Sequence, residues 1–479
     1  MGYKIGVDKQ QLSLLPACLD DYVPEDHICR VINAFTGQLD IAALGYKHAE
    51  CKSTGCRPYD PRMMLNLYIY GYLHRVRSSR RLRDETIRNI EVMWLTEGLK
   101  PDDKTICNFR TDNATALAET FRIFSRLCRT LGLLGGELVA TDSTKFRANN
   151  SLKNNYNEIV VKNELSRTDK KIQEYMQALA EADAAEENMP EPSASDIKAA
   201  LERLNQRKVK FEELYTRVQE AGEISTVDPD ARMMRSGGDA RELDVCYNVH
   251  TVVDSQHHLI VDFDVSNCSS DAVQLKNMSD KAKDIMEVQN LTNLADKGYY
   301  ASGEIVACEK NGITCLVAKP SPGGPKKPAG FQRQDFIYDS TKDAYICPAQ
   351  QELRFKYERK HISGREYRVY SNAPACGKCQ QKSTCTTYRH REVQRLSCQD
   401  VLDRVDERTH KHKELYRKRQ EIVEHPFGTI KAVWGYKQFL CRTQANVSAE
   451  TALTCIAYNL RRICNIFAGN EVSSAMALR

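Results

Sequence analysis

The chain has 479 residues, of which 41% are hydrophobic and 28% charged, and its formal net charge is only +5. This is ordinary globular composition for about two or three domains, so any nucleic-acid surface must come from local charge clusters. No run of about 18 apolar residues and no apolar N-terminal signal segment is present, so we expect neither secretion nor a membrane span. We expect the 18 cysteines to be mostly reduced, in a cytoplasmic protein.

The first predicted region, residues 1–130, is helical and locally basic. Asp60 and Pro61 predict a helix start, and a second helix follows through Trp94. Between positions 57 and 88 there are eight arginines and only three acids. Residues 101–113 begin another helix, and we expect the side chain of Arg110 to face outward. Short helices with arginine-rich connections favour contact with the DNA backbone or a helix-turn-helix variant, although a helical interaction domain with a solvated face fits too. The predicted DNA contacts are Arg75, Arg77, Arg80, Arg81 and Arg83.

The pattern then changes to strands. Residues 138–140 predict a short buried strand that ends at Asp142, a common place for a metal ligand. The insert 152–222 is charged and predicts a helical hairpin that reverses at Pro190 and Pro192. We expect this arm to make an inter-subunit contact.

Strands and helices alternate from residue 224 to residue 320. Two strands predict a hairpin around 254–257, and the later strand 291–295 leads to Asp296. Asp142 and Asp296 could each simply cap a turn, which is the usual role of an aspartate at a strand end. Their placement at two strand ends of one sheet also suits metal binding.

Residues 321–399 form a cysteine-rich insert behind a Pro/Gly-rich linker. Cys376 and Cys379 form a CxxC pair, and Cys347 and Cys385 complete a set of four thiolates. Tetrahedral zinc needs four soft ligands on tight turns, which favours a zinc-ribbon-like module. Cys398 is an alternative ligand, and free buried thiols or redox chemistry are alternatives to zinc.

The stretch 410–439 predicts an amphipathic helix with a basic face. Glu424 lies among these bases, with Lys431 seven residues later. An acid on a phosphate-binding face makes sense if it holds a divalent metal beside the phosphate. The simpler alternative is a solvated helix whose glutamate pairs with arginine or lysine. Trp434 and Tyr436 could stack on a base, but we expect both in the core.

With these segments in hand, the chain resembles bacterial insertion-sequence transposases of the DDE type, in particular the group named after insertion sequence eleven-eighty-two. The segments VATDSTKFRANNS, LADKGYYAS and VEHPFGTIK carry the resemblance. In the wider group, a Tyr and an Arg precede the Glu by seven and four residues. Those positions here hold Arg417 and Gln420, while Tyr416 and Arg419 lie one residue earlier.

The resemblance implies an α/β fold: an RNase H-like mixed-sheet core (131–320 plus 400–479) with an all-α N-terminal DNA-binding domain. It implies that Asp142, Asp296 and Glu424 are the catalytic ligands of Mg²⁺, or Mn²⁺, in a two-metal site. Arg419, Lys431 and Tyr416 are then expected to contact DNA.

The expected activity is cleavage at terminal inverted repeats and transfer of the 3′ ends to target DNA, with a homodimer in the synaptic complex on nucleoid DNA. The rivals are an RNase H-like nuclease that never transfers strands and a catalytically idle DNA-binding protein.

Overall fold

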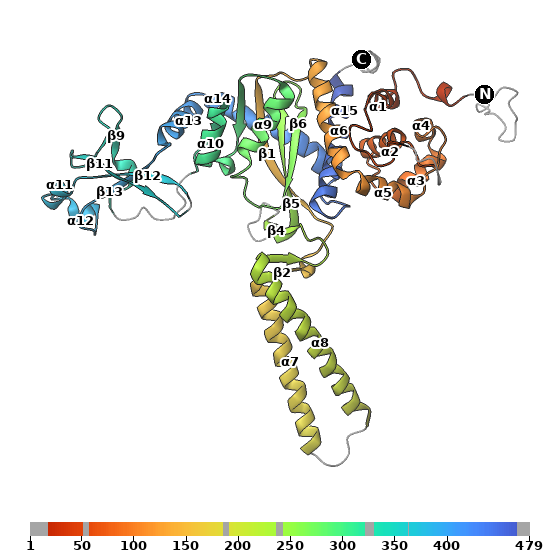
Figure 1. The fold of residues 1–479 in the computed structure, drawn as a ribbon, viewed down its shortest axis with the longest axis horizontal. Coiled ribbons are helices and arrows are strands. Elements are labelled where there is room, and N and C mark those ends of the chain that lie inside the picture. Colours follow the sequence, from red (N-terminus) through yellow and green to blue (C-terminus); the bar gives the residue numbers. More distant parts are fainter. Residues whose placement is uncertain are drawn as a thin grey trace, which may run out of the picture.

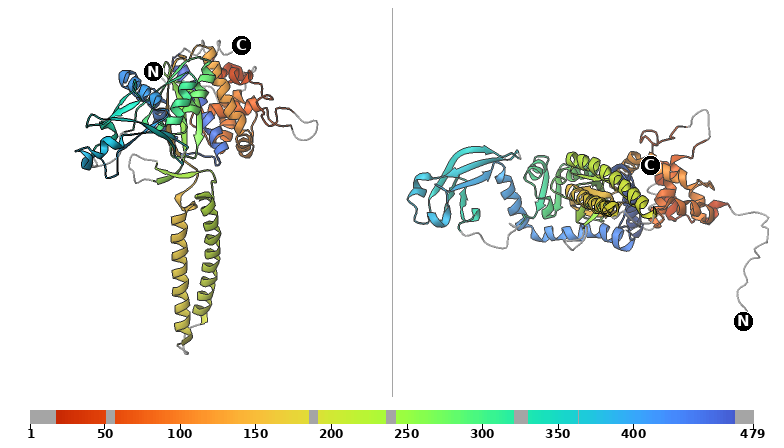
Figure 2. Two further views of the ribbon diagram at one scale, coloured as in Figure 1. Left: turned by 60° about the vertical axis from the view of Figure 1, so that its left-hand side comes forward. Right: turned by 90° about the horizontal axis from the view of Figure 1, so that it is seen from below.

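The computed structural model describes residues 18–50, 57–184, 191–235, 243–320, 330–362 and 364–466. A central sheet with helices on its faces forms the body of the molecule (Figure 1). The N-terminal helices flank it on one side and the cysteine-rich module on the other, while a long helical arm projects away from it (Figures 1 and 2). None of the described helices is long and apolar enough to cross a membrane.

The central sheet is mixed, as predicted. β1 pairs in parallel with β7, β7 pairs in parallel with β8, and β5 runs antiparallel to β1. The outer side of β5 pairs with β6 along one half and with β4 along the other. The six strands are β1 (Leu138–Arg147), β4 (Arg232–Arg235), β5 (Leu243–Asp254), β6 (Ile260–Ser266), β7 (Leu291–Ala295) and β8 (Ile313–Val317).

The register of β1 against β7 places the two predicted aspartates together. The last parallel pair is Thr141 with Ala295, so Asp142 is the next residue of β1 and Asp296 is the first residue after β7. The expectation that β1 ends at Asp142 is wrong, because β1 continues to Arg147 by pairing with β5 after β7 has ended. Asp142 therefore has a rigid, paired backbone on one side and an open sheet edge on the other.

Helices cover both faces of this sheet. On one face lies α9 (Leu275–Met286), where Asn293 of β7 donates to Ser279 at 2.7 Å. On the other face lies α14 (Lys413–Phe427), which continues as a π-helical turn (Gly428–Val433). α10 (Ser302–Lys310) and α13 (Gln399–Lys411) pack beside β8.

The N-terminal helices differ in burial from what the sequence predicts. α2 starts at Pro61 as predicted, with Asp60 accepting from the Arg62 backbone N–H at 2.7 Å. However, α2 is buried on nearly all sides rather than along one stripe, and a Cβ at Gly71 would lie only 2.5 Å from Leu82 Cδ2. The helices are α1 (Ile28–Gly37), α2 (Pro61–Leu73), α3 (Ser79–Arg88), α4 (Ile90–Leu95), α5 (Asp103–Asp112) and α6 (Ala114–Thr130).

The helical region shares one continuous hydrophobic core with the sheet. The C-terminal helix α15 (Gln444–Ile466) packs against α2, α6 and β6. The predicted boundary at residue 130 thus coincides with the end of α6, but the hydrophobic core does not stop there.

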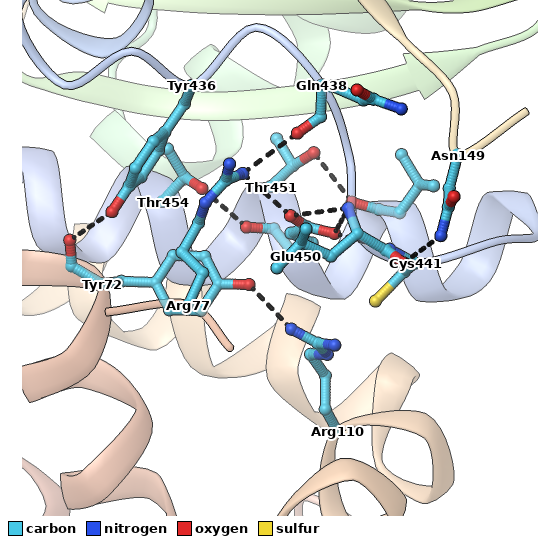
Figure 3. Close-up of polar contacts among 12 residues, drawn as sticks. Tyr72, Arg77, Arg110, Asn149, Tyr436, Gln438, Cys441, Glu450, Thr451 and Thr454 are labelled. Atoms are coloured by element: carbon cyan, nitrogen blue, oxygen red, sulfur yellow. Dashed lines mark hydrogen bonds and ion pairs between the residues drawn. The ribbon is translucent and has the colours of Figure 1, made fainter. Parts of the chain in front are cut away.

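A buried carboxylate ties these parts together (Figure 3). Glu450 of α15 is fully buried and accepts hydrogen bonds from the backbone N–H groups of Leu440 (2.9 Å) and Cys441 (3.0 Å). Its other partner is Arg77, whose Nη1 lies 3.1 Å away and also donates to the Gln438 carbonyl. The Arg77 guanidinium stacks over Tyr436, so helices, loop and sheet edge are held by one buried charge pair.

Two long helices occupy the region predicted to be a helical hairpin. α7 (Glu158–Ala184) and α8 (Glu191–Ala221) pack against each other, and β2 (Asn155–Asn157) pairs with β3 (Glu223–Ser225) at their base. A separate small core of Val161, Phe211, Leu214, Val218 and Ile224 lies at this end. The predicted turn at Pro190 and the side chain of Pro192 lie outside the described residues.

The cysteine-rich module is a five-stranded antiparallel sheet with two short helices, α11 (Ala373–Gly377) and α12 (Lys382–Cys385). Among its described residues, the buried core cluster consists of Phe336, Tyr345, Leu353, Tyr370 and Val393, with a few partly buried side chains packed against it. The strands are β9 (Ile337–Asp339), β10 (Ala344–Ile346), β11 (Glu352–Lys360), β12 (Glu366–Ser371) and β13 (Glu392–Leu396).

Candidate active site

Asp142 and Asp296 face one cation, the guanidinium of Arg419. Arg419 Nη1 lies 3.1 Å from Asp142 Oδ2, and Nη2 lies 3.7 Å from Asp296 Oδ1. The side chains of both aspartates remain partly exposed, at 28% and 43%. The sheet edge therefore presents two carboxylates that already bracket a positive charge.

Asp142 is the more buried of the two acids. Burial raises the pKa of its carboxyl group, while the Ser143 backbone N–H and Arg419 oppose the rise and the Asp296 and Asp271 carboxylates add to it. Neighbouring negative charges that raise a pKa are a physical mark of a site that favours a cation.

Helix α14 carries two predicted residues, Tyr416 and Arg419, to this edge. The Tyr416 hydroxyl donates to the Ala295 carbonyl at 3.2 Å, immediately before Asp296. Tyr416 and Arg419 are three residues apart and therefore share a helix face. They lie at the acids although both are displaced by one residue from the family spacing.

Glu424, the third predicted acid, lies on the same helix but is turned to solvent. Its Oε1 accepts from Gln420 Nε2 at 2.7 Å, and its side chain is exposed. Five residues on a helix correspond to about 140° of rotation, so Glu424 and Arg419 point in different directions. The three acids do not bring ligand atoms within 4.8 Å of one another in this conformation.

Lys431 projects from the π-helical turn onto β1. Its Nζ lies 2.6 Å from both Thr144 Oγ1 and the Lys145 carbonyl, and 4.7 Å from the Phe146 ring centroid. Burial lowers the pKa of Lys431 to about 8. The ammonium group is thus anchored two residues along β1 from Asp142, on the same face of the strand.

Comparison with known protein families shows which family the chain belongs to. Residues 220–460, slightly more than half of the chain, match the transposase DDE domain family. The chain belongs to the DDE transposase family. Residues 17–112 match a second family, a transposase domain (DUF772), and no significant match was found among curated proteins or solved structures.

The family match supports the transposase assignment made from the sequence. It spans Asp296 and Glu424 but begins after Asp142. The assignment of the first acid therefore rests on the pairing of β1 with β7, which places Asp142 next to Asp296.

A further acid, Asp271, lies beside the candidate site and was not among the residues predicted from the sequence. Asp271 Oδ1 accepts from Ser143 Oγ and from Asn248 Nδ2, both at 2.8 Å. A Cβ at Gly298 would lie 3.2 Å from Asp271 Oδ2. Asp271 thus contacts the neighbour of Asp142 and the turn that follows Asp296. No spacing motif signals it, because its partners come from three separate segments.

A buried histidine completes this polar network. His250 Nδ1 lies 2.9 Å from the Tyr299 hydroxyl, and Nε2 lies 3.1 Å from Ser266 Oγ. Tyr299 is fully buried three residues after Asp296, and its pKa is raised by burial and by the nearby acids, Asp271 first. The network fixes the Asp296 turn against β5 and β1.

Replacing Asp271 by asparagine is expected to slow DNA nicking by about 10- to 100-fold, the usual cost of losing an outer partner of a metal site. The amide keeps the shape and one acceptor, so the protein should fold and bind DNA normally. Single-turnover nicking over a range of Mg²⁺ concentrations measures the effect, which should include a higher Mg²⁺ requirement.

Asp284→Asn is the matched control. Asp284 also lies between β6 and β7, but it is exposed and pairs with Arg126. Equal nicking by the Asp271 and Asp284 variants would show that Asp271 has no part in the site.

The predicted DNA-contacting arginines separate into two groups. Arg77 differs from the prediction: its guanidinium pairs with buried Glu450 and stacks over Tyr436, so it is engaged inside the protein. Arg80 and Arg83 share Asp103 at 3.7 and 3.4 Å but remain partly exposed. Arg75 and Arg81 are exposed, and neither forms an ion pair with another described residue.

Arg110 is also a correction. We expected it to face outward, but it is 6% exposed, donates to the Tyr72 hydroxyl at 3.1 Å and lies 5.6 Å from the Tyr68 ring centroid. The aromatic rings of α2 provide a cation–π environment that periodicity cannot reveal.

The four predicted zinc ligands line one hollow of the cysteine-rich module. The Gln351 backbone N–H donates to Cys347 Sγ at 3.4 Å, as in turns that stabilise a metal-bound thiolate. Cys398, the alternative ligand, instead precedes α13 and borders a different hollow. Every described cysteine is a free thiol.

One other group could suggest a metal site. Within the described ranges, only His27, Cys29 and Glu91 bring three candidate ligand atoms within 4.8 Å. However, His27 Nδ1 accepts the Cys29 backbone N–H at 3.3 Å, so a neutral ring carries its proton on Nε2, 3.5 Å from Glu91. Both ring nitrogens are then engaged, and this group is a helix cap with a polar partner.

Proposed function

We propose that this transposase cleaves DNA at the ends of an insertion sequence of the eleven-eighty-two type and joins the 3′ ends to target DNA. The observation that carries the proposal is the pair of carboxylates, Asp142 and Asp296, that bracket one cation at an open sheet edge. The strand order and the acid-bearing helix fit an RNase H-like core.

The residues present fit divalent metal. Asp142, Asp296 and Glu424 supply carboxylate oxygens, which Mg²⁺ prefers and Mn²⁺ accepts. Arg419 stands where positive charge is stabilised, and Glu424 is exposed and, among the described residues, held only by its hydrogen bond from Gln420, so its side chain could change rotamer. Bound metal would polarise the attacked phosphate and lower the pKa of the attacking water or 3′-hydroxyl.

The chain's own residues would position the DNA. Displaced from the two aspartates, the Arg419 guanidinium can bind a phosphate bidentately. The Tyr416 hydroxyl and the Lys431 ammonium lie on either side of the acids and would fix the strand next to the scissile bond. In-line displacement at phosphorus requires little beyond such positioning and charge neutralisation.

The decisive test is to incubate the protein with a duplex that carries its element end and to map nicks. We expect nicks at the element boundary with Mg²⁺, none with Ca²⁺, and none with Glu424→Ala. Glu421→Ala is the matched control, an exposed glutamate on the same helix. Absence of any cut by the wild-type protein would support the idle DNA-binding rival. Cut ends without joined products would support the nuclease.

Structural zinc in the cysteine-rich module is part of this proposal. In the described part of the module, the core cluster has only five buried hydrophobic residues, too few to stabilise a separate unit without a metal or disulfides. Four thiols line one hollow, although their sulfurs must move closer together to share an ion, because no three lie within 4.8 Å.

We expect the purified protein to hold about one zinc ion per chain and Cys379→Ser to lose it, because tetrahedral zinc needs all four thiolates. Plasma emission spectrometry of the protein measures the metal content. Cys398→Ser is the matched control and should keep its zinc, since Cys398 borders another hollow. Zinc loss from the Cys398 variant, or its retention in the Cys379 variant, would refute this ligand set.

The remaining assignments concern partners. We propose that Arg75, Arg80, Arg81 and Arg83 contact the terminal repeat on nucleoid DNA in the bacterial cytoplasm. We also propose that the α7–α8 arm contacts a second protomer in the synaptic complex. The arm fits this role because its two long helices, α7 and α8, project away from the body of the molecule (Figure 2).

A further inference from the structure

The outer side of α14 is divided into two flanks by the contacts of the helix with the sheet. Arg419 points at the two aspartates, and Ile422 and Val423 of the same face are buried. Each residue of an α-helix turns by about 100°, so the remaining positions fall on either side of this face. Lys413, Arg417, Gln420 and Glu424 form the first flank, and Glu414, Lys418, Glu421 and His425 form the second flank.

The second flank faces the start of β1. His425 Nδ1 lies 2.7 Å from the Tyr458 hydroxyl, which donates to the His258 carbonyl in the turn between β5 and β6. This turn lies beside the first residues of β1, because β5 runs antiparallel to it. The first flank is on the opposite side of the helix and therefore faces the end of the sheet where β7 stops and the two aspartates lie.

The two flanks also differ in charge. The first flank carries Lys413 and Arg417, which are exposed and form no ion pair with another described residue. Its only acid is the proposed third metal ligand. The second flank carries two acids, Glu414 and Glu421, four residues before and three residues after Lys418, and this spacing places them next to its ammonium group. A polyanion that reaches the aspartates is therefore attracted by the first flank and not by the second.

The spacing of the two free cations suits one strand of DNA. A helix rises about 1.5 Å per residue, so Lys413 and Arg417 are about 6 Å apart along α14, and Arg417 and Glu424 are about 10 Å apart. Phosphates of one strand follow each other by about 3.4 Å along the duplex axis. A strand that follows the first flank thus brings several phosphates within reach of these long side chains, and a guanidinium can bind one of them bidentately.

We propose that the strand to be cleaved runs along the first flank of α14 and that Lys413 and Arg417 bind its phosphates beside the scissile one. Both are positioning residues, since they hold the strand in line with the aspartates and do not touch the reacting atoms. The proposal rests on the proposed DNA cleavage function and adds to it the side of α14 on which the strand lies and two phosphate contacts.

The first test measures binding of the full-length protein to a duplex that carries the element end, in Ca²⁺ and at several salt concentrations. Arg417→Gln is expected to lower the slope of log Kd against log salt by about one, and Arg417→Gln combined with Lys413→Gln by about two. Lys418→Gln is the matched control, because it removes one exposed positive charge from the same helix but from the second flank. This control should keep the wild-type slope.

The second test locates the contact on the DNA. Single phosphates around the element boundary are replaced by neutral methylphosphonates, and the affinity of each duplex is measured. We expect wild type to lose affinity at one or two positions beside the scissile phosphate, and Arg417→Gln to lose nothing further at the position that Arg417 binds. A merely structural effect of the substitution would weaken binding to every duplex by the same factor.

Equal salt slopes for the Arg417, Lys413 and Lys418 variants would overturn the proposal, even if the protein nicks element ends in Mg²⁺. A position-specific loss that disappears in Arg417→Gln, without any Mg²⁺-dependent nick, would support the strand path and contradict the cleavage function. The two proposals therefore fail separately.

Discussion

Replacing Asp142 by asparagine should lower the rate of end nicking by at least about 1,000-fold. Removing one neutral donor from a charge-stabilising site costs about 100- to 1,000-fold, and this change removes a full negative charge. The substitution also takes away the closer partner of Arg419, which is 3.1 Å away. Single-turnover nicking in Mg²⁺ measures the rate.

DNA binding by this variant in Ca²⁺ should stay within about threefold of wild type, because the lost carboxylate would, if anything, repel phosphate. Asp254→Asn is a poor comparison, since Asp254 is buried in the β5–β6 turn. Asp244→Asn is a better control, on β5 and paired with exposed Arg147. Nicking by Asp142→Asn at the rate of Asp244→Asn would remove Asp142 from the site.

Replacing Glu450 by alanine should reduce the free energy of unfolding by about 3–5 kcal/mol, the usual cost of breaking a buried charge pair by removing one partner. Glu450 is fully buried and Arg77 is 17% exposed, so solvent screens their pair little. Two backbone N–H groups would also lose their acceptor. Fluorescence of Trp434 during guanidinium unfolding, in a Trp94→Phe background, reports on this region.

The exposed pair of Arg354 and Glu352 provides the control, and Arg354→Ala should cost no more than about 1 kcal/mol. The double replacement of Arg77 and Glu450 by methionine should be more stable than Glu450→Ala, because it leaves no unpaired buried charge. A loss below about 1 kcal/mol for Glu450→Ala would contradict the assigned role.

The order of helices and strands could be predicted from the sequence, because signals from neighbouring residues determine where these elements form. The Asp60–Pro61 helix start, the β5–β6 hairpin and the α7–α8 hairpin each depend on neighbouring residues. Asp142 and Asp296 could be paired in advance because parallel strands end at the same edge of a sheet. The extent of β1 could not, since it depends on pairing with β5 about 100 residues later.

The errors at Arg77 and Arg110 have a common physical cause. Both arginines were judged from the residues around them in the sequence. Their partners, Glu450 for Arg77 and Tyr72 for Arg110, come close only in the folded protein. Asp271 was missed for the same reason, because its contacts with Ser143 and Asn248 join three distant segments. Glu424 was recognised by its basic surroundings, and its solvent-facing conformation is set by the pitch of α14.

The helical arm has a consequence for how the core forms. β1 and β5 are direct neighbours in the sheet, yet the chain between them includes both arm helices. A long unstructured connection would make this pairing slow, because the entropy of loop closure must be lost first. A helical hairpin needs only local contacts and can form within about microseconds. Because β2 and β3 close the base of the arm, the formed hairpin brings the end of β1 near the start of β5. The arm can therefore lower the entropy cost of pairing these two strands and speed the formation of the central sheet.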